Sequence, residues 1–94
     1  MKLSVVVPAF NEERLLPQTL KHLRAGLAVF ERRGWSTELI VCDNNSTDRT
    51  AGIARAAGAR VVFEPVNQIA RARNAGAAQA TGDWLLFVLS LIHI

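Results

Sequence analysis

Residues 39–48 read Leu39-Ile40-Val41-Cys42-Asp43-Asn44-Asn45-Ser46-Thr47-Asp48, an apolar run followed directly by carboxylates, amides and hydroxyls. The same order recurs at residues 3–13, where Leu3-Ser4-Val5-Val6-Val7-Pro8 precedes Asn11-Glu12-Glu13. Ligands of a parallel sheet bind at the carboxyl ends of its strands. The two polar clusters therefore predict a nucleotide site where two neighbouring strands end.

The composition is typical of a folded globular protein. Half of the 94 residues are hydrophobic and a fifth are charged, which predicts one domain with a modest core, small for a complete two-substrate enzyme. The 11 Lys and Arg outnumber the 8 Asp and Glu without forming a basic run. This pattern argues against a nucleic-acid partner and mildly favours anionic ligands. The single cysteine, Cys42, predicts a buried thiol in a reducing compartment.

Neither end of the sequence predicts a membrane or export segment. The first apolar run stops at Pro8, too soon for a signal peptide. The apolar residues 84–94 are fewer than the ~20 needed to cross a bilayer, so we interpret them as a buried strand. We therefore expect a cytoplasmic protein without a transmembrane segment.

Hydrophobic periodicity predicts strands alternating with helices. A β-branched run without alternation indicates a first strand covered on both faces and stopped by Pro8. Three further strands are expected at Trp35–Cys42, at Arg60–Glu64 and from Trp84 to Val88. This order predicts a parallel sheet with right-handed crossovers and no internal repeat.

Three helices are expected between these strands. Apolar residues from Leu15 to Phe30 recur at helical spacing, with Pro17 in the first turn and an end near Gly34. A short helix follows the polar turn, with Ser46 or Asn45 as its N-cap and Gly58 at its end. An alanine-rich helix spans Ala70–Ala80 and is closed by Gly82.

Three motifs carry a resemblance to a known family. They are Val6-Val7-Pro8-Ala9-Phe10-Asn11-Glu12-Glu13, residues 41–48, and Ala70-Arg71-Ala72-Arg73-Asn74-Ala75-Gly76. Together with residues 81–88 they resemble the signatures of the inverting family 2 glycosyltransferases, over roughly nine tenths of the chain. Residues 1–94 resemble the N-terminal nucleotide-sugar-binding part of such a domain, with 89–94 departing from the pattern.

The resemblance implies a fold and a reaction. The fold would be α/β, a Rossmann-like (GT-A type) three-layer sandwich with a mostly parallel sheet, here truncated. The reaction would transfer a sugar from a nucleotide-diphosphate sugar, UDP- or GDP-linked, to an acceptor hydroxyl with inversion. The sugar and the acceptor stay unidentified, and a longer parent protein at the inner face of the membrane stays compatible with the resemblance.

The resemblance also implies the nucleotide-sugar-binding residues. The first loop would contribute Pro8, Ala9, Asn11 and Glu12. Asp43 would accept a hydrogen bond from the base, because an ionised carboxylate is acceptor-only. The remaining candidates are Asn45 and, on one face of the third helix, Arg71 and Asn74.

Each of these residues also has a purely structural interpretation. Glu12 and Glu13 could complement the dipole of the following helix. An Asx turn and a helix cap could explain residues 43–48, and they explain Ser46 and Asp48 best, whereas the roles of Asn44 and Asn45 stay open. Arg71 could be a solvated surface cation.

The family pattern fails after Val88. There the family has an Asp-x-Asp arrangement that holds Mg²⁺ or Mn²⁺, whereas this sequence has Leu89-Ser90-Leu91. We therefore expect no metal ligands and no catalytic residue in this chain, because the general base would lie further on. The chain would bind donor nucleotide at most.

The sequence leaves one alternative function open, a non-catalytic Rossmann-like nucleotide-binding or interaction module. A dinucleotide oxidoreductase is disfavoured, because no Gly-x-Gly-x-x-Gly follows the first strand.

Overall fold

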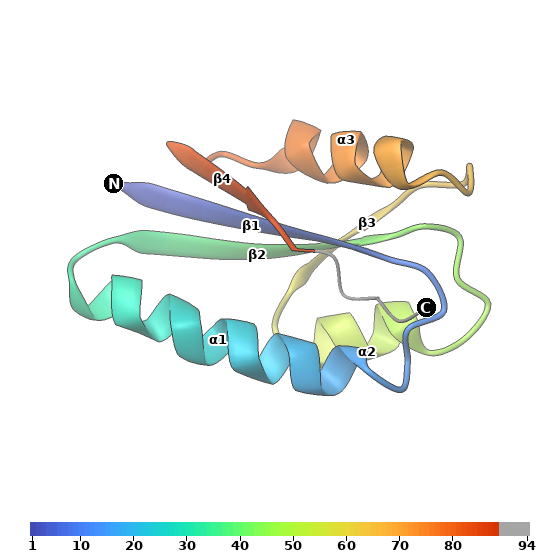
Figure 1. Ribbon diagram of the computed structural model, residues 1–94, viewed down its shortest axis with the longest axis horizontal. Coiled ribbons are helices and arrows are strands. Elements are labelled where there is room, and N and C mark those ends of the chain that lie inside the picture. Colours follow the sequence, from blue (N-terminus) through green and yellow to red (C-terminus); the bar gives the residue numbers. More distant parts are fainter. Residues whose placement is uncertain (89–94) are drawn as a thin grey trace.

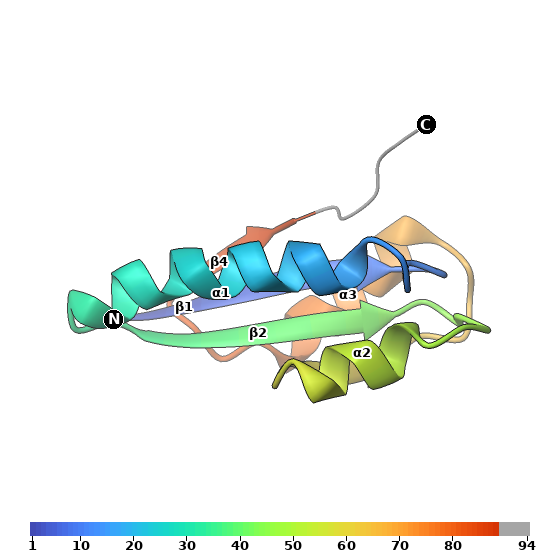
Figure 2. The same ribbon diagram turned by 90° about the horizontal axis from the view of Figure 1, so that it is seen from below.

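The computed structural model describes residues 1–88, which form a four-stranded parallel sheet between two layers of helices (Figure 1). The strand order is β3-β2-β1-β4 and every neighbouring pair is parallel. Helices α1 and α2 cover one face, and α3 covers the other (Figures 1 and 2). The elements in chain order are β1 (Lys2–Ala9), α1 (Leu16–Arg32), β2 (Ser36–Asp43), α2 (Thr50–Ala56), β3 (Arg60–Phe63), α3 (Ile69–Gln79) and β4 (Trp84–Phe87). The predicted α/β three-layer sandwich is confirmed.

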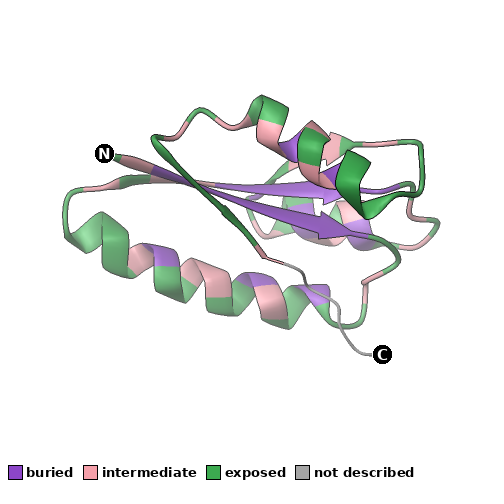
Figure 3. Ribbon diagram, turned by 45° about the horizontal axis from the view of Figure 1, so that its top comes forward, coloured by how far each residue is buried: buried purple, intermediate pink, exposed green. Residues whose placement is uncertain are grey.

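The core lies around the two central strands, β1 and β2, which Figure 3 shows as buried over most of their length. The apolar stripe of α1 packs against one face of these strands, and its Leu16, Leu20 and Leu27 are buried. Helix α3 approaches the other face closely at Gly76. A β-carbon at Gly76 would lie 2.4 Å from Cγ1 of Val6, so only glycine allows this spacing.

Strand β1 continues through Pro8 to Ala9, so the prediction that Pro8 stops the strand is wrong. Val6 O accepts a hydrogen bond from Val88 N on the β4 side, whereas Ala9 O accepts one from Asn44 N on the β2 side. The N–H and C=O groups of successive residues point alternately to the two neighbouring strands, so the backbone nitrogen of Pro8, like that of Val6, points to the β4 side. Because β4 pairs only as far as Val6, the missing N–H of Pro8 leaves no ladder bond unmade.

The ends of two helices also differ from the prediction. Helix α2 starts at Thr50, and Asp48, rather than Ser46 or Asn45, accepts a hydrogen bond from the first helical N–H, at 2.9 Å. Helix α3 ends at Gln79, before Gly82. Gly82 is needed for close packing, because a β-carbon there would lie 2.5 Å from Ser4 Oγ.

Strand β4 forms as predicted, but the prediction that it is buried is wrong for residues 84–87. The exposed fractions of its four side chains run from 39% at Phe87 to 58% at Trp84. It is an edge strand paired only with β1, and it is the exposed strand in Figure 3. Residues 89–94, which include the predicted departure from the family pattern, lie outside the described residues.

No helix within residues 1–88 is both long enough and apolar enough to span a bilayer.

Candidate functional site

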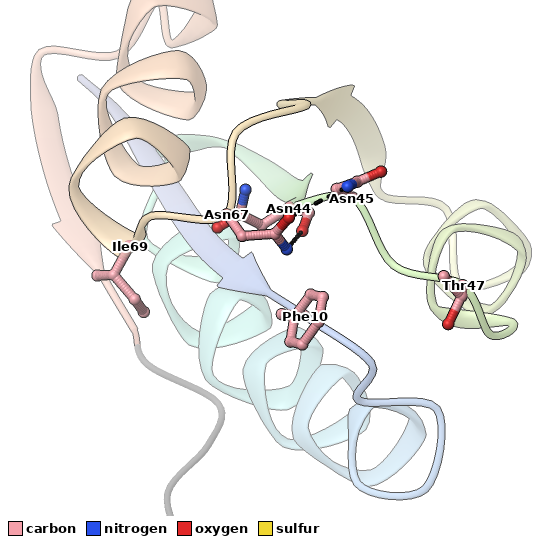
Figure 4. Close-up of a pocket in the computed structure, with 6 residues that line it drawn as sticks. All are labelled: Phe10, Asn44, Asn45, Thr47, Asn67 and Ile69. Carbon is pink, nitrogen blue, oxygen red and sulfur yellow. Dashed lines mark hydrogen bonds between the residues drawn. The ribbon is translucent and has the colours of Figure 1, made fainter.

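A cavity of about 490 Å³ opens at the carboxyl edge of the sheet (Figure 4). Its residues come from the loops after β1 and β2, from the segment between β3 and α3, and from the first residue of α3. Its lining residues are Phe10, Asn44, Asn45, Thr47, Asn67 and Ile69. The wall therefore combines short amides and a hydroxyl with an aromatic ring and an aliphatic side chain, the mixture typical of a small-molecule site.

Three asparagines hold the β2 side of this cavity in place. The Asn44 side chain is buried, and its Nδ2 donates to the carbonyls of Glu64 and Val66. Asn67 Nδ2 donates to Asn44 O at 3.0 Å and Asn67 Oδ1 accepts from Asn45 Nδ2 at 3.1 Å. Asn45 has a φ of +63°, a left-handed conformation that asparagine tolerates better than most residues. The amides thus fix a strained turn at the cavity wall.

Asp43 is the last residue of β2, and its side chain is only 6% exposed. Its Oδ1 accepts a hydrogen bond from Ser46 N at 3.0 Å, which is the Asx turn expected from the sequence. No hydrogen bond within residues 1–88 reaches its Oδ2. One carboxylate oxygen of Asp43 therefore closes the Asx turn, and the other has no hydrogen-bond donor within residues 1–88.

The loop after β1 is bonded to the loop after β2. Asn11 has a φ of +50°; its N–H donates to Ser46 Oγ, and its Oδ1 accepts from Thr47 N at 2.8 Å. Glu12 N donates to Thr50 Oγ1 at 2.9 Å. The two predicted clusters therefore do lie side by side, and the side chain of Asn11 is already engaged in joining them.

Glu13 and Asp48 complete this junction. Glu13 N donates to Asp48 Oδ2 and Glu13 Oε1 accepts from Arg49 N, so Glu13 serves the start of α2, not the start of α1 as predicted. Burial alone would raise the pKa of Asp48, but hydrogen bonds from Thr50 and from the Glu13 N–H outweigh burial and hold this pKa below its usual value.

Arg71 and Asn74 share one face of α3, as predicted, but they do not line the cavity of Figure 4. They border a separate depression of about 570 Å³, together with Glu64 and Gln68. Asn67 and Ile69 line the first cavity, whereas Gln68 borders this depression, so the chain at the start of α3 lies between the two hollows. Arg71 has no hydrogen bond or ion pair within the described part of the chain.

The remaining candidates lie at the ends of the strands. Pro8 and Ala9 are buried in β1 opposite Cys42 and Asp43, so their backbone can shape the site but their side chains cannot reach solvent. Asn11 and Glu12 line a third hollow, of about 280 Å³. Cys42 is fully buried, as predicted, and burial, followed by the charges of Glu64 and Asp43, raises the pKa of its thiol to about 11.

Sequence reasoning missed five residues that line the main cavity. Phe10, Thr47, Asn67 and Ile69 were not predicted as site residues, and the role of Asn44 was left open. Phe10 and Thr47 adjoin predicted residues, so neighbourhood alone would have found them. Asn67 belongs to a short connection without a local signal, and Ile69 is the first residue of α3. Only the folding of this connection across the end of β2 brings the two residues to the site.

The described residues do not fit a divalent metal ion. Within residues 1–88, no group of three or more His, Cys, Asp or Glu side chains could hold one. The nearby carboxylates of Glu13, Asp43 and Asp48 each accept hydrogen bonds from backbone N–H groups instead. The segment Leu89-Ser90-Leu91, where the family is expected to bind the metal, lies outside the described residues.

Comparison with known proteins gives one consistent result. The family described as "Glycosyl transferase family 2" matches residues 4–88. The sequence is 41% identical over 78 residues to an uncharacterised glycosyltransferase of Mycobacterium tuberculosis (strain ATCC 25618 / H37Rv), an alignment that covers 83% of this chain and 31% of that protein.

Solved structures agree with the sequence match. Glucosyl-3-phosphoglycerate synthase of Mycobacterium tuberculosis in complex with UDP matches with a TM-score of 0.77 at 33% identity, over 97% of this chain and 34% of that chain. The same enzyme with Mn²⁺, UDP and glucosyl-3-phosphoglycerate matches with a TM-score of 0.76 at 33% identity, over 95% and 33% of the two chains. The predicted GT-A type fold is confirmed, and this chain spans about a third of the length of the proteins it matches.

Proposed function

The chain belongs to glycosyltransferase family 2, and from this membership we propose that its carboxyl edge binds the nucleotide of a nucleotide-diphosphate-sugar donor. In a longer protein of this family the bound sugar would pass to an acceptor hydroxyl with inversion. The candidate contacts are Pro8, Ala9, Asn11, Glu12, Asp43, Asn45, Arg71 and Asn74. Residues 1–94 are proposed to be the donor-binding part of that domain.

The observation that carries this proposal is the environment of Asp43. A nearly buried carboxylate at the end of a central strand keeps one oxygen without a hydrogen bond inside the described chain. A buried acceptor without a partner is costly, so a ligand N–H that reaches it gains a charge-assisted hydrogen bond. Uracil and guanine both carry such an N–H, so the charge of Asp43 suits both UDP- and GDP-linked donors.

Uracil is the donor base that the complexes of the structural neighbour favour. Glucosyl-3-phosphoglycerate synthase was crystallised with UDP and, in another complex, with UDP-glucose and Mn²⁺. Another complex of that enzyme contains Mg²⁺ and UDP. We propose the same class of donor here, and a Mg²⁺ or Mn²⁺ requirement for transfer by a longer protein, with ligands other than those in residues 1–88.

A second candidate function is a nucleotide-binding module without transferase activity. The absence of a carboxylate cluster that could hold a metal within residues 1–88 favours it for the chain taken alone. The two proposed functions differ in whether sugar is transferred. Both require nucleotide binding, but only the first predicts sugar transfer once the rest of a family 2 domain is present.

Isothermal titration of the chain with UDP and with GDP, with and without Mn²⁺, tests donor binding. The variant Asp43→Asn keeps an Oδ1 acceptor for Ser46 N. It replaces the other carboxylate oxygen with an NH₂ donor and removes the negative charge. Loss of a charge-assisted hydrogen bond should weaken nucleotide binding by about 10- to 100-fold. Affinity for UDP that is unchanged in this variant would remove Asp43 from the site.

Asp83→Asn is the matched control, because Asp83 lies at the other end of the sheet, where its Oδ2 accepts from Lys2 N. It removes the same charge and should leave nucleotide affinity unchanged. If both variants lose binding equally, net charge rather than the strand-end carboxylate is responsible. If a folded wild-type chain binds neither nucleotide, the donor-binding proposal fails for this chain.

A further inference from the structure

The helical layer formed by α1 and α2 carries a charge imbalance. With their flanking residues, 12–34 and 48–58, the two helices contain seven Lys and Arg and four acidic residues, Glu12, Glu13, Glu31 and Asp48. The other four Lys and Arg of the chain are balanced by four Asp and Glu. The whole net charge of +3 therefore lies in this layer. The seven cations are Arg14, Lys21, Arg24, Arg32, Arg33, Arg49 and Arg55.

None of these seven cations makes an ion pair within residues 1–88, and the carboxylates of Glu13 and Asp48 lie at the start of α2, at the opposite end of this layer from Arg32 and Arg33. The ion pair within residues 1–88 joins Lys2 to Glu38. Glu31 accepts a hydrogen bond from the Thr37 hydroxyl, and Arg24 donates to Gly58 O at 2.7 Å. The positive potential of this layer is thus available to an external partner.

The fold directs this charge outward. Helix α1 buries Leu16, Leu20 and Leu27 against the sheet. Lys21 and Arg32 lie on the opposite side at helical spacing and are exposed. Figure 2, seen from below, shows α1 and α2 on the same face of the sheet, and the two helices also contact each other.

An apolar patch adjoins the basic residues where α1 ends. Val29 is 47% exposed and Phe30 is 39% exposed. The Phe30 ring packs edge-on against Trp35, with 5.4 Å between ring centroids. With Arg33 these three side chains line a shallow cavity of about 270 Å³. Aromatic and aliphatic side chains next to arginines are the combination that settles at a bilayer surface, where rings reach the headgroup level and cations meet lipid phosphates.

We propose that the α1–α2 face docks on an anionic lipid bilayer, with Val29, Phe30 and Trp35 at headgroup depth and the surrounding cations on lipid phosphates. A nucleic acid would satisfy the charges, but its phosphate backbone would leave the apolar patch in water. The patch lies at the C-terminal end of α1, away from the loop that holds Asn11. Docking through it leaves the carboxyl-edge cavity open to a donor.

Vesicle co-sedimentation of the full chain tests the proposal. Vesicles of phosphatidylcholine mixed with phosphatidylglycerol should bind the chain at about 0.1 M NaCl and release most of it at about 0.5 M, because salt screens exposed charges. Pure phosphatidylcholine vesicles should bind it far less. Equal binding to both lipids, or binding that salt does not change, would overturn the proposal.

Paired charge variants locate the surface. Arg32→Gln combined with Arg33→Gln should weaken binding to anionic vesicles by about 30-fold. The matched control combines Arg60→Gln with Arg73→Gln, which removes the same charge from β3 and α3 and should change binding by less than about threefold. An equal effect of both pairs would assign the attraction to net charge and contradict a specific face.

Tryptophan fluorescence gives an independent readout, because the chain has two tryptophans on different elements. In Trp84→Phe the remaining Trp35 should shift its emission to the blue when anionic vesicles are added. A shift seen only in Trp35→Phe would place strand β4 at the lipid and overturn the proposal. So would binding to a DNA duplex that exceeds vesicle binding and depends on the same two arginines.

Discussion

Short side chains and single glycines set the geometry at the residue scale. Asn11 and Asn45 occupy left-handed conformations in the two loops that meet at the carboxyl edge. Their amides bond to the neighbouring loop or to Asn67, so turn formation and cavity shape depend on the same atoms. The prediction that Asn11 and Asn45 contact nucleotide remains a proposal. Both side chains already make hydrogen bonds within the protein, so any contact with nucleotide would have to be made in addition to these bonds.

Gly76→Ala should destabilise the chain by about 1–3 kcal/mol, because the added methyl group would overlap Val6 across the layer between α3 and β1. Gly52→Ala, in the middle of α2, is the matched control. A β-carbon there meets nothing within 4 Å, so this change should stabilise the chain by up to about 1 kcal/mol through helix propensity. Urea unfolding followed by circular dichroism measures both, and two variants that shift in the same direction would contradict this packing.

At the element scale, β4 is attached to the sheet by a polar cluster around Glu38. Ser4 Oγ donates to Glu38 Oε2 and accepts from Gly82 N, while Thr81 N donates to the same carboxylate at 2.7 Å. Burial alone would raise the pKa of Glu38, but the hydrogen bonds from Ser4 and Thr81 and the charge of Lys2 outweigh it and lower the pKa. The ionised carboxylate thus links β1, β2 and the turn before β4.

This lowered pKa predicts a loss of stability in acid. Because the pKa of Glu38 is lower in the folded chain than in the unfolded one, the stabilisation is fully present above about pH 4.3 and disappears as the pH falls through the folded-state value. Glu38→Gln should therefore be less stable than wild type at neutral pH, and the difference should shrink towards pH 3. Thermal unfolding across this range measures it, and a constant difference between the two proteins would show that the charge of Glu38 contributes nothing.

Most elements were predictable from the sequence because their signals are local. Apolar spacing located α1, a β-branched run located β1 and an apolar run located β2, each strand to within about two residues. The errors at Pro8, Gly82 and β4 have one physical cause: each depends on which strand lies alongside. No local pattern tells that β4 is too short to reach the level of Pro8, or that Asn67 folds across the end of β2.

At the scale of the whole molecule, β4 forms an edge of the sheet that no second strand within residues 1–88 pairs with. It offers four exposed apolar side chains, and residues 84–87 contain none of the charges or prolines that usually block such edges. The proteins that this chain matches are about three times as long, so a longer family member has further chain with which to cover this strand.

We expect the 94-residue chain to associate through β4 in a concentration-dependent manner. Leu86→Lys, which places a charge on the exposed strand, should shift the population towards monomer in sedimentation-velocity experiments. Val66→Lys is the matched control, because Val66 is similarly exposed, at 40% against 48% for Leu86, but lies outside the sheet. A wild-type chain that stays monomeric at high concentration, or a control that suppresses association as strongly, would contradict the prediction.

The position of β1 in the sheet also has a consequence for how the protein is made. A ribosome delivers the strands in the order β1, β2, β3, β4, whereas the sheet arranges them as β3-β2-β1-β4. One edge of β1 can pair with β2 early, but its other edge pairs Leu3 with Trp84, almost the full chain apart. Closing so long a loop is entropically costly and slow. The most buried strand of the protein is therefore the first to be synthesised and, on one side, the last to be paired.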